Sequence, residues 1–304
     1  MVLVCNEGNF RWGNASAGIL NLSNQKWVED GFKQVNGRSL GDVLQSATYW
    51  NENWWLVVNN SSKIEVVDGQ KFTALKTITG LTSPRFLLPV SNSKAYISDI
   101  YAQKIWILDG NSNIPIGSIG FKGWSEEMVL SENKVWVVCR NKAKVFIINS
   151  EFDQLTDSIS LPGNSTSIAV SKNENIWVGF DSSGSKNPGI AYINSKTRKI
   201  EKLIYSNERG RYLSHFQTSQ TKDSLFFLQN GVFMVRENSS EFPTQNFANS
   251  LSGNWYGMGF DPKRREIYLS DAKDYQQKSR IFKIKSNSTE ELAGGIISSR
   301  FYFW

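Results

Sequence analysis

The feature that most constrains the fold of this chain is a repeat of about forty residues. Each copy contains a short strand-like segment with an aromatic third residue, and these residues are Trp55, Tyr96, Trp136, Trp177, Phe226 and Tyr268. A polar turn precedes each segment, and in four copies a further apolar segment ends in Asp or Asn at positions 68, 109, 149 and 194. A unit of this length with four short strands is typical of one blade of a β-propeller.

The two ends of the chain complete the repeat. Complete units cover roughly residues 45–292, residues 2–6 match the aromatic strand, and residues 299–303 match the first strand at 84–88. The sequence therefore predicts an all-β, seven-bladed β-propeller closed by pairing of the C-terminal strand with the N-terminal blade. The single domain spans 1–304, with blades at about 300–304 plus 2–36, 45–79, 84–120, 126–160, 166–204, 213–250 and 255–292.

The alternatives to seven blades are a ring with another number of blades and a pair of stacked sandwiches. A six- or eight-bladed ring requires one unit to be miscounted, most easily in the irregular stretch 205–254, and the regular period disfavours two stacked sandwiches. Helical periodicity is nearly absent, and only residues 40–44 could form a helical turn.

Composition excludes several classes of function. Hydrophobic residues make up 40% of the chain and charged residues 20%, which suits a large folded core. The net charge of +6 is dispersed, and the densest basic run, at 263–265, follows a turn, so we expect no nucleic-acid partner. No apolar run approaches the roughly 18 residues of a membrane helix. Cys5 and Cys139 fall at the same place in blades expected on opposite sides of the ring, so we expect two free, buried cysteines.

Catalysis is disfavoured because His215 is the only histidine, and one imidazole cannot build a zinc site or a Ser-His-Asp relay. No phosphate-binding loop is present. Carboxylate chemistry stays open: six acidic residues could meet in the channel to bind Ca²⁺ or act as a glycosidase-like pair, namely Glu7, Asp42, Asp99, Glu126, Glu127 and Asp271. Ion pairs with Arg85, Arg140 and Arg300 explain these carboxylates more simply. We expect no enzyme, no cofactor and no metal.

The repeat resembles that of YVTN or surface-layer propellers. Segments 6–10, 13–16, 40–43 and 59–61, together with Pro84, Arg85 and the aromatic C-terminus, are similar to secreted, usually lipid-anchored propellers of Bacteroidetes. Some of those proteins bind cobamides (vitamin B12 and relatives) and pass them to an outer-membrane transporter. The resemblance implies a cell-surface protein, a lipid anchor upstream of this sequence, a cobamide-like ligand and a transporter as partner.

Propellers of this kind bind ligands on the face where loops enter the first strand and leave the second strand of each blade. This sequence places amides, carboxylates, arginines and aromatic residues there, and such residues suit a flat ligand that carries amides. The expected ligand contacts are Asn6, Glu7, Asp42, Asn59, Asn60, Arg85, Asp99, Tyr101, Trp124, Glu126, Arg140, His215, Trp255, Tyr256 and Asp271. Turn capping is the competing role for the Asp and Asn residues. The alternative function is a glycan- or protein-binding scaffold that uses Trp12, Trp27, Trp50 and Trp124.

Overall fold

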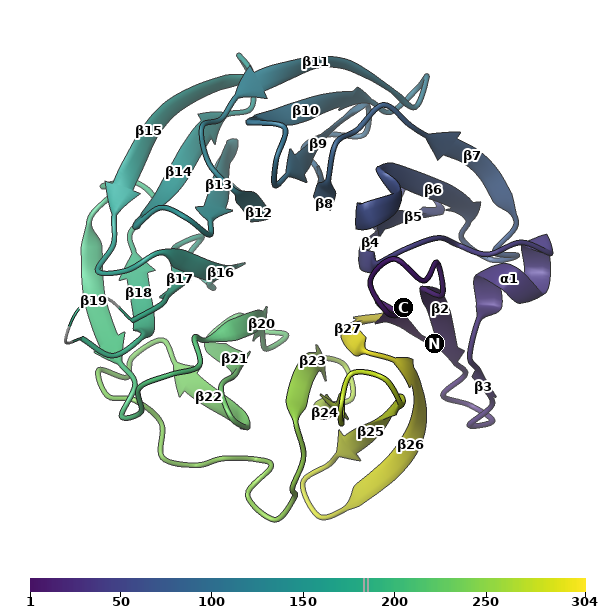
Figure 1. Ribbon diagram of the computed structural model, residues 1–304. Coiled ribbons are helices and arrows are strands. Elements are labelled where there is room, and N and C mark those ends of the chain that lie inside the picture. Colours follow the sequence, from purple (N-terminus) through teal and green to yellow (C-terminus); the bar gives the residue numbers. More distant parts are fainter. Residues whose placement is uncertain (183, 185) are drawn as a thin grey trace.

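The computed structural model describes residues 1–182, 184 and 186–304, which form short strands arranged as a ring (Figure 1). Four sheets have four antiparallel strands each. They are β4 (Leu44–Trp50), β5 (Asn53–Val58), β6 (Lys63–Asp68) and β7 (Ala74–Ile78); β8 (Pro84–Pro89), β9 (Lys94–Asp99), β10 (Lys104–Asp109) and β11 (Ile114–Gly120); β12 (Ser125–Ser131), β13 (Lys134–Cys139), β14 (Lys144–Asn149) and β15 (Gln154–Ser160); and β16 (Ser165–Val170), β17 (Ile176–Phe180), β18 (Gly189–Ile193) and β19 (Ile200–Tyr205).

Two further sheets belong to the same arrangement. One has three strands, β20 (Ser214–Thr218), β21 (Ser224–Leu228) and β22 (Val232–Arg236). The other has eight strands. One half of it contains β23 (Trp255–Asp261), β24 (Glu266–Asp271), β25 (Lys278–Ile284) and β26 (Thr289–Ile296), and the other half contains β27 (Ser298–Phe303), β1 (Val2–Asn6), β2 (Ser16–Leu20) and β3 (Trp27–Val28).

The fold is therefore all-β and propeller-like, but the expected count of seven separate blades needs correction. Five sheets of blade size stand alone, in place of the seven expected. The physical reason is a parallel bridge between Met258 and Arg300, which joins β23 to β27 and merges the first and last expected blades into one sheet.

The two ends of the chain meet in that sheet. Strand β27 pairs antiparallel with β1, in a register that places Val2 opposite Phe303 and Val4 opposite Phe301. The backbone N–H of Trp304 also donates to the carbonyl of Met1 at 3.2 Å. Both termini consequently lie on neighbouring strands (Figure 1).

Burial follows the repeat. The aromatic residues of the second strands are buried, and Trp55, Trp136 and Trp177 are among the largest fully buried side chains. Their strands are apolar on both faces because neighbouring sheets pack on either side, whereas outer strands such as β11 and β15 alternate or are polar. Trp50, expected to be exposed, is also buried, since it packs on Trp55 with ring centroids 5.1 Å apart.

The expected helical turn at 40–44 is wrong, and the helix lies earlier, as α1 (Gly31–Asn36). Asp30 caps it by accepting from the Lys33 N–H, and Gly37 ends it at a left-handed φ of 68°. A 3-10 turn, η1 (Asn59–Ser61), is the other helical segment among the described residues. Cys5 and Cys139 are buried free thiols, as expected.

Candidate ligand-binding site

A β-bulge near the start of each innermost strand shapes the centre of the ring. Strands β4, β8, β12, β16, β20, β23 and β27 lie nearest the channel (Figure 1), and each shows a register shift against its partner close to its first residue. A bulge bends the strand and re-aims the side chain of the extra residue. The bulges contain Gln45, Arg85, Phe86, Glu126, Glu127, Thr166, Ser167, His215, Phe216, Tyr256 and Ser299.

Every bulge contributes at least one residue to a single cavity of about 360 Å³, and all of the bulged residues except Phe86, Ser167 and Phe216 line it. The rest of the lining comes from the first residues of three inner strands, from the ends of the second strands and from the loops around the inner strands: Glu7, Arg140, Arg211, Tyr212, Ser214, Leu228, Gln229, Asn230, Trp255, Tyr275 and Arg300. The cavity therefore lies on the face where loops enter first strands and leave second strands. Its volume falls in the range of small-molecule sites.

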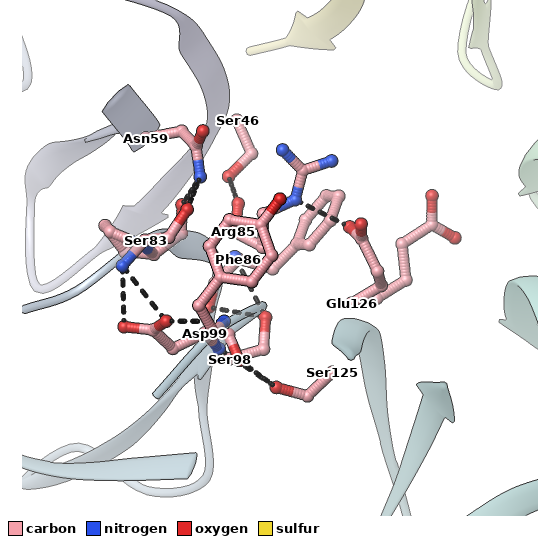
Figure 2. Close-up of polar contacts among 12 residues, drawn as sticks. Ser46, Asn59, Ser83, Arg85, Phe86, Ser98, Asp99, Ser125 and Glu126 are labelled. Carbon is pink, nitrogen blue, oxygen red and sulfur yellow. Dashed lines mark hydrogen bonds and ion pairs between the residues drawn. The ribbon is translucent and has the colours of Figure 1, made fainter. Parts of the chain in front are cut away.

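Two ion pairs join charged side chains that line the cavity. The Nε of Arg85 donates to Glu126 at 2.9 Å between adjacent inner strands (Figure 2). Arg300, on β27, donates to Glu127, on β12, at 2.6 Å. Glu127 also accepts from the hydroxyl of Ser167, so its carboxylate is satisfied by protein groups. Both carboxylates are therefore neutralised within the structure.

The third carboxyl group, Glu7, lies in a different environment. It accepts a hydrogen bond from the Tyr256 hydroxyl at 3.0 Å. Burial raises the pKa of Glu7, and this exceeds the opposing effect of the Tyr256 hydrogen bond. Burial and the neighbouring Glu7 likewise raise the pKa of Tyr256. Glu7 and Tyr256 therefore line the cavity with a carboxyl and a hydroxyl group whose charged forms are disfavoured by burial.

His215 lies in the same cavity in a strained backbone conformation, with φ of +56°. Its Nδ1 is 3.0 Å from the hydroxyl of Ser214. Burial, with the positive charge of Arg300, lowers the pKa of His215 to about 3. The imidazole is therefore neutral at physiological pH and can serve as a hydrogen-bonding group.

Arg140 is held by stacking. Its guanidinium lies over the ring of Tyr212, 4.0 Å from the ring centroid. Its Nη1 is buried and has no hydrogen-bond partner among the described residues. By contrast Arg211 donates to the carbonyl of Trp255 at 2.6 Å and to the side chain of Asn254 at 2.8 Å. Among the described residues, Arg140 thus has no side-chain N–H group that donates to a protein acceptor.

Several of the residues expected as ligand contacts have structural roles outside the cavity. Asp99 is fully buried and accepts from the backbone N–H groups of Thr82 and Ser83, which tie the loop before β8 to the end of β9 (Figure 2). Its carboxylate also accepts from the indole of Trp106 at 3.1 Å. Asp271 plays the corresponding part in another blade by accepting from the Asn254 N–H at 2.8 Å. Turn capping explains both residues.

The N-terminal candidates behave in the same way. Asp42 accepts from the backbone of Arg11 and from the amide of Asn60. Asn59 donates to the Ser83 hydroxyl at 2.8 Å, a contact visible in Figure 2. Asn6 is buried and bonds to Ser16 and Ser298. Of the fifteen expected contacts, those that line the cavity are Glu7, Arg85, Glu126, Arg140, His215, Trp255 and Tyr256.

Tyr101 and Trp124 lie on the same loop face outside the cavity lining. Their rings make an edge-to-face pair with centroids 6.2 Å apart, and they are 62% and 43% exposed. Four other exposed aromatic residues lie in loops at this face: Phe10 and Trp12 after β1, Tyr212 before β20 and Tyr275 after β24. The loop face therefore carries a set of exposed aromatic side chains. We call these six residues the aromatic rim.

Some cavity residues were not expected from the sequence. Gln45 and Thr166 lie in bulges, one residue into β4 and β16, where an unbroken strand would have aimed them differently. Arg211 and Tyr275 come from loops without a repeat pattern. The recurring position just inside each first strand is the signal that would have identified the bulged residues.

The acidic residues considered for metal or hydrolytic chemistry do not all converge. Glu7, Glu126 and Glu127 line the cavity, whereas Asp42, Asp99 and Asp271 hold loops elsewhere. Within the described residues no group of three or more His, Cys, Asp or Glu side chains is placed to hold a metal ion.

Comparison with known proteins gives the family. Residues 2–304 match a domain family described as a domain of unknown function, DUF5074. The chain belongs to this family. Among curated proteins, none matches the sequence. No helix in the described part of the chain is long and apolar enough to span a membrane.

Solved structures share the architecture at low identity. A quinonprotein alcohol dehydrogenase-like protein from Bacteroides thetaiotaomicron is 12% identical, with a TM-score of 0.78 over 99% of this chain and 78% of that one. The dihydro-heme d1 dehydrogenase NirN, in complex with DHE, is 9% identical, with a TM-score of 0.64 over 99% and 74%. A computationally designed protein, Ika8, is 9% identical, with a TM-score of 0.67 over 99% and 91%. At these identities the likeness shows the fold alone.

Proposed function

We propose that this protein binds a small organic ligand in the cavity at the mouth of its central channel and does not transform it. The observation that carries the proposal is the contribution of a bulged residue from every innermost strand to one cavity of about 360 Å³. Bulges disrupt pairing locally, so a ring of them at one end of the channel is better explained by a site than by stability. Aromatic, carboxyl and guanidinium groups supply contact area and directed hydrogen bonds.

The proposed absence of catalysis rests on how the polar groups are used. Glu126 and Glu127 are neutralised by Arg85 and Arg300, so neither is a free acid or base. The dehydrogenase activities in the names of two structural neighbours are not carried over to this chain, because at 12% and 9% identity the likeness shows the fold alone. A carboxylate-dependent hydrolase is tested by lactone and glycoside turnover.

We infer that the eight-stranded sheet acts as two blades, because a single bridge, Met258 to Arg300, joins its halves. The pairing of β27 with β1 then closes a seven-bladed ring and completes the cavity, since β27 supplies Ser299 and Arg300.

A cobamide, as the family resemblance suggests, is one ligand to test. It is larger than a drug-sized molecule, so it would bind across the cavity mouth, with its ring against the aromatic rim rather than inside the cavity. Cell-surface location, a lipid anchor upstream and an outer-membrane transporter as partner are parts of the same proposal. The exposed rim residues also favour a second candidate, a glycan- or protein-binding surface.

The test is a thermal-shift screen of the protein against a metabolite library that includes cobamides and oligosaccharides. Hits are repeated with Tyr256→Leu, which removes the hydroxyl bonded to Glu7, and with Tyr49→Leu, which changes an exposed tyrosine near the end of β4. We expect Tyr256→Leu to weaken binding and Tyr49→Leu to leave it unchanged. Equal effects of the two variants on every hit would contradict binding in the cavity.

A further inference from the structure

Four guanidinium groups line the cavity, and protein acceptors engage three of them. Arg85 is paired with Glu126, Arg300 with Glu127, and Arg211 donates to backbone and side-chain oxygens of neighbouring residues. The side chain of Arg140 makes no hydrogen bond or ion pair with any described residue, and its Nη1 is buried. A buried cationic donor without an acceptor is costly, so such a group needs a specific explanation.

Stacking fixes this free guanidinium in place. The Tyr212 ring lies 4.0 Å from it, a geometry that orients the planar group while leaving its edge donors available. The loop that carries Arg140 is held in turn, because the Arg140 N–H donates to the Trp124 carbonyl at 3.0 Å. An oriented guanidinium presents two parallel N–H groups, the arrangement that matches a carboxylate or phosphate.

The charge of the cavity favours an anion. With Glu126 and Glu127 neutralised by their partners, the remaining carboxyl group is Glu7, whose proton is held more tightly because of burial. Arg140 therefore forms no ion pair with any carboxylate of the described residues. An anionic ligand would form one with it.

The groups around Arg140 also indicate what accompanies the anionic group. Trp255, Tyr256 and Tyr275 line the same cavity, and the last two make an edge-to-face pair with centroids 5.6 Å apart. Aromatic side chains of this kind bind planar, apolar molecules with little loss of conformational freedom.

We propose that the ligand of this cavity is a planar organic anion whose carboxylate or phosphate group is bound by Arg140, with Tyr212 positioning the guanidinium. This inference rests on the proposed function of the cavity. It identifies the ligand by its chemical class and names Arg140 as the residue that selects for charge.

The test compares three probes of similar shape, benzoate, phenyl phosphate and benzamide, in ligand-observed NMR titrations. We expect the two anions to bind at least about tenfold more tightly than benzamide, as the loss of one charged hydrogen-bond pair implies. Arg140→Gln should weaken binding of the anions by about tenfold or more and leave benzamide unchanged, and Arg140→Lys should give an intermediate loss.

Arg11→Gln is the matched control. Arg11 also stacks on an aromatic ring, that of Phe10 at 5.3 Å, and it follows β1 on the same face, but it is not part of the cavity lining. We expect this variant to bind all three probes as the unmodified protein does. Melting temperatures establish whether each variant folds. If Arg140→Gln does not fold, Arg140→Lys is compared with the unmodified protein instead.

Two results would overturn the inference and are distinguishable from failure of the proposed function. Benzamide binding as tightly as benzoate, or anion binding unaffected by Arg140→Gln, would refute selection by Arg140 while leaving the cavity as a ligand site. If no probe binds, a crystallographic fragment soak decides. Only neutral fragments in the cavity would refute the inference alone, and an empty cavity would refute the proposed function with it.

Discussion

The ion pair between Arg300 and Glu127 links two inner strands far apart in the sequence, and its strength can be worked from the structure. Its atoms are 2.6 Å apart, and the two side chains are 20% and 14% exposed. Breaking a fully buried pair costs about 3–5 kcal/mol, whereas exposed pairs contribute about 0–1 kcal/mol. The partial exposure places this pair between the two limits.

We therefore expect Glu127→Gln and Arg300→Met each to lower the free energy of unfolding by about 2 kcal/mol. Glu127→Gln retains an acceptor for the Ser167 hydroxyl, and Arg300→Met keeps an unbranched side chain but loses the guanidinium that lies over the Phe86 ring, 4.6 Å from its centroid. The double variant should show a coupling energy of about 1–2 kcal/mol, because the second substitution removes no further attraction.

Urea unfolding followed by tryptophan fluorescence measures these values, provided that all variants have the same dependence on urea concentration. The pair between Lys196 and Glu132 is the control, since its atoms are 3.6 Å apart and its side chains are 75% and 32% exposed. Its coupling should not exceed about 0.5 kcal/mol. Equal coupling energies for the two pairs would refute the assignment of Arg300 and Glu127 as a stabilising link between inner strands.

Three further predictions concern the pairing of β27 with β1, His215 and the capping aspartate Asp99. Deleting residues 299–304 removes most of the strand that pairs with β1, so the melting temperature should fall sharply, and an unchanged value would contradict closure by this strand. His215 should stay neutral as the pH falls from 8 to 5, because its pKa is lowered to about 3, so its imidazole NMR signals should not move; a midpoint near pH 6.5 would contradict the buried placement. The same shift predicts stability that is fully present above about pH 6.5 and is lost as the pH falls toward 3. Asp99→Ala leaves buried backbone N–H groups without an acceptor and should cost about 2 kcal/mol or more in urea unfolding, whereas removing the exposed carboxylate of Glu151 should cost less than about 0.5 kcal/mol.

The strands were predictable because the repeat imposes the same physical requirement on each unit. An aromatic residue such as Trp136 or Trp177 must be buried between neighbouring sheets, so its position marks the second strand each time. The merging of the end blades was not predictable. It depends on one bridge between Met258 and Arg300, and the sequence pattern carries no information on a single backbone contact.

The face that carries the cavity was predictable from the sequence, and the identity of the residues that line it was not. Loops around the inner strands supply Glu7, Arg140 and Tyr212 to the cavity, as the repeat indicates. Gln45 and Thr166 reach it only because bulges interrupt the alternation of side chains, and a shift of one residue moves a side chain to the opposite face of a strand.

Asp99 and Asp271 were expected as ligand contacts, and they lie outside the cavity lining. An aspartate at the end of a strand on the loop face is of a residue type common in binding sites, yet nearby backbone N–H groups donate to both carboxylates. Local turn chemistry therefore outweighs ligand chemistry at these positions. Only the three-dimensional structure separates a carboxylate already bonded to the backbone from one that faces the cavity.

The most direct test of a ligand site at the mouth of the channel is a crystallographic fragment soak of this protein. We expect bound fragments to cluster in the cavity and to contact the bulged residues Thr166, His215 and Tyr256, and we expect the anionic fragments to lie against Arg140. Fragments distributed over other surfaces, with the cavity empty, would contradict this expectation.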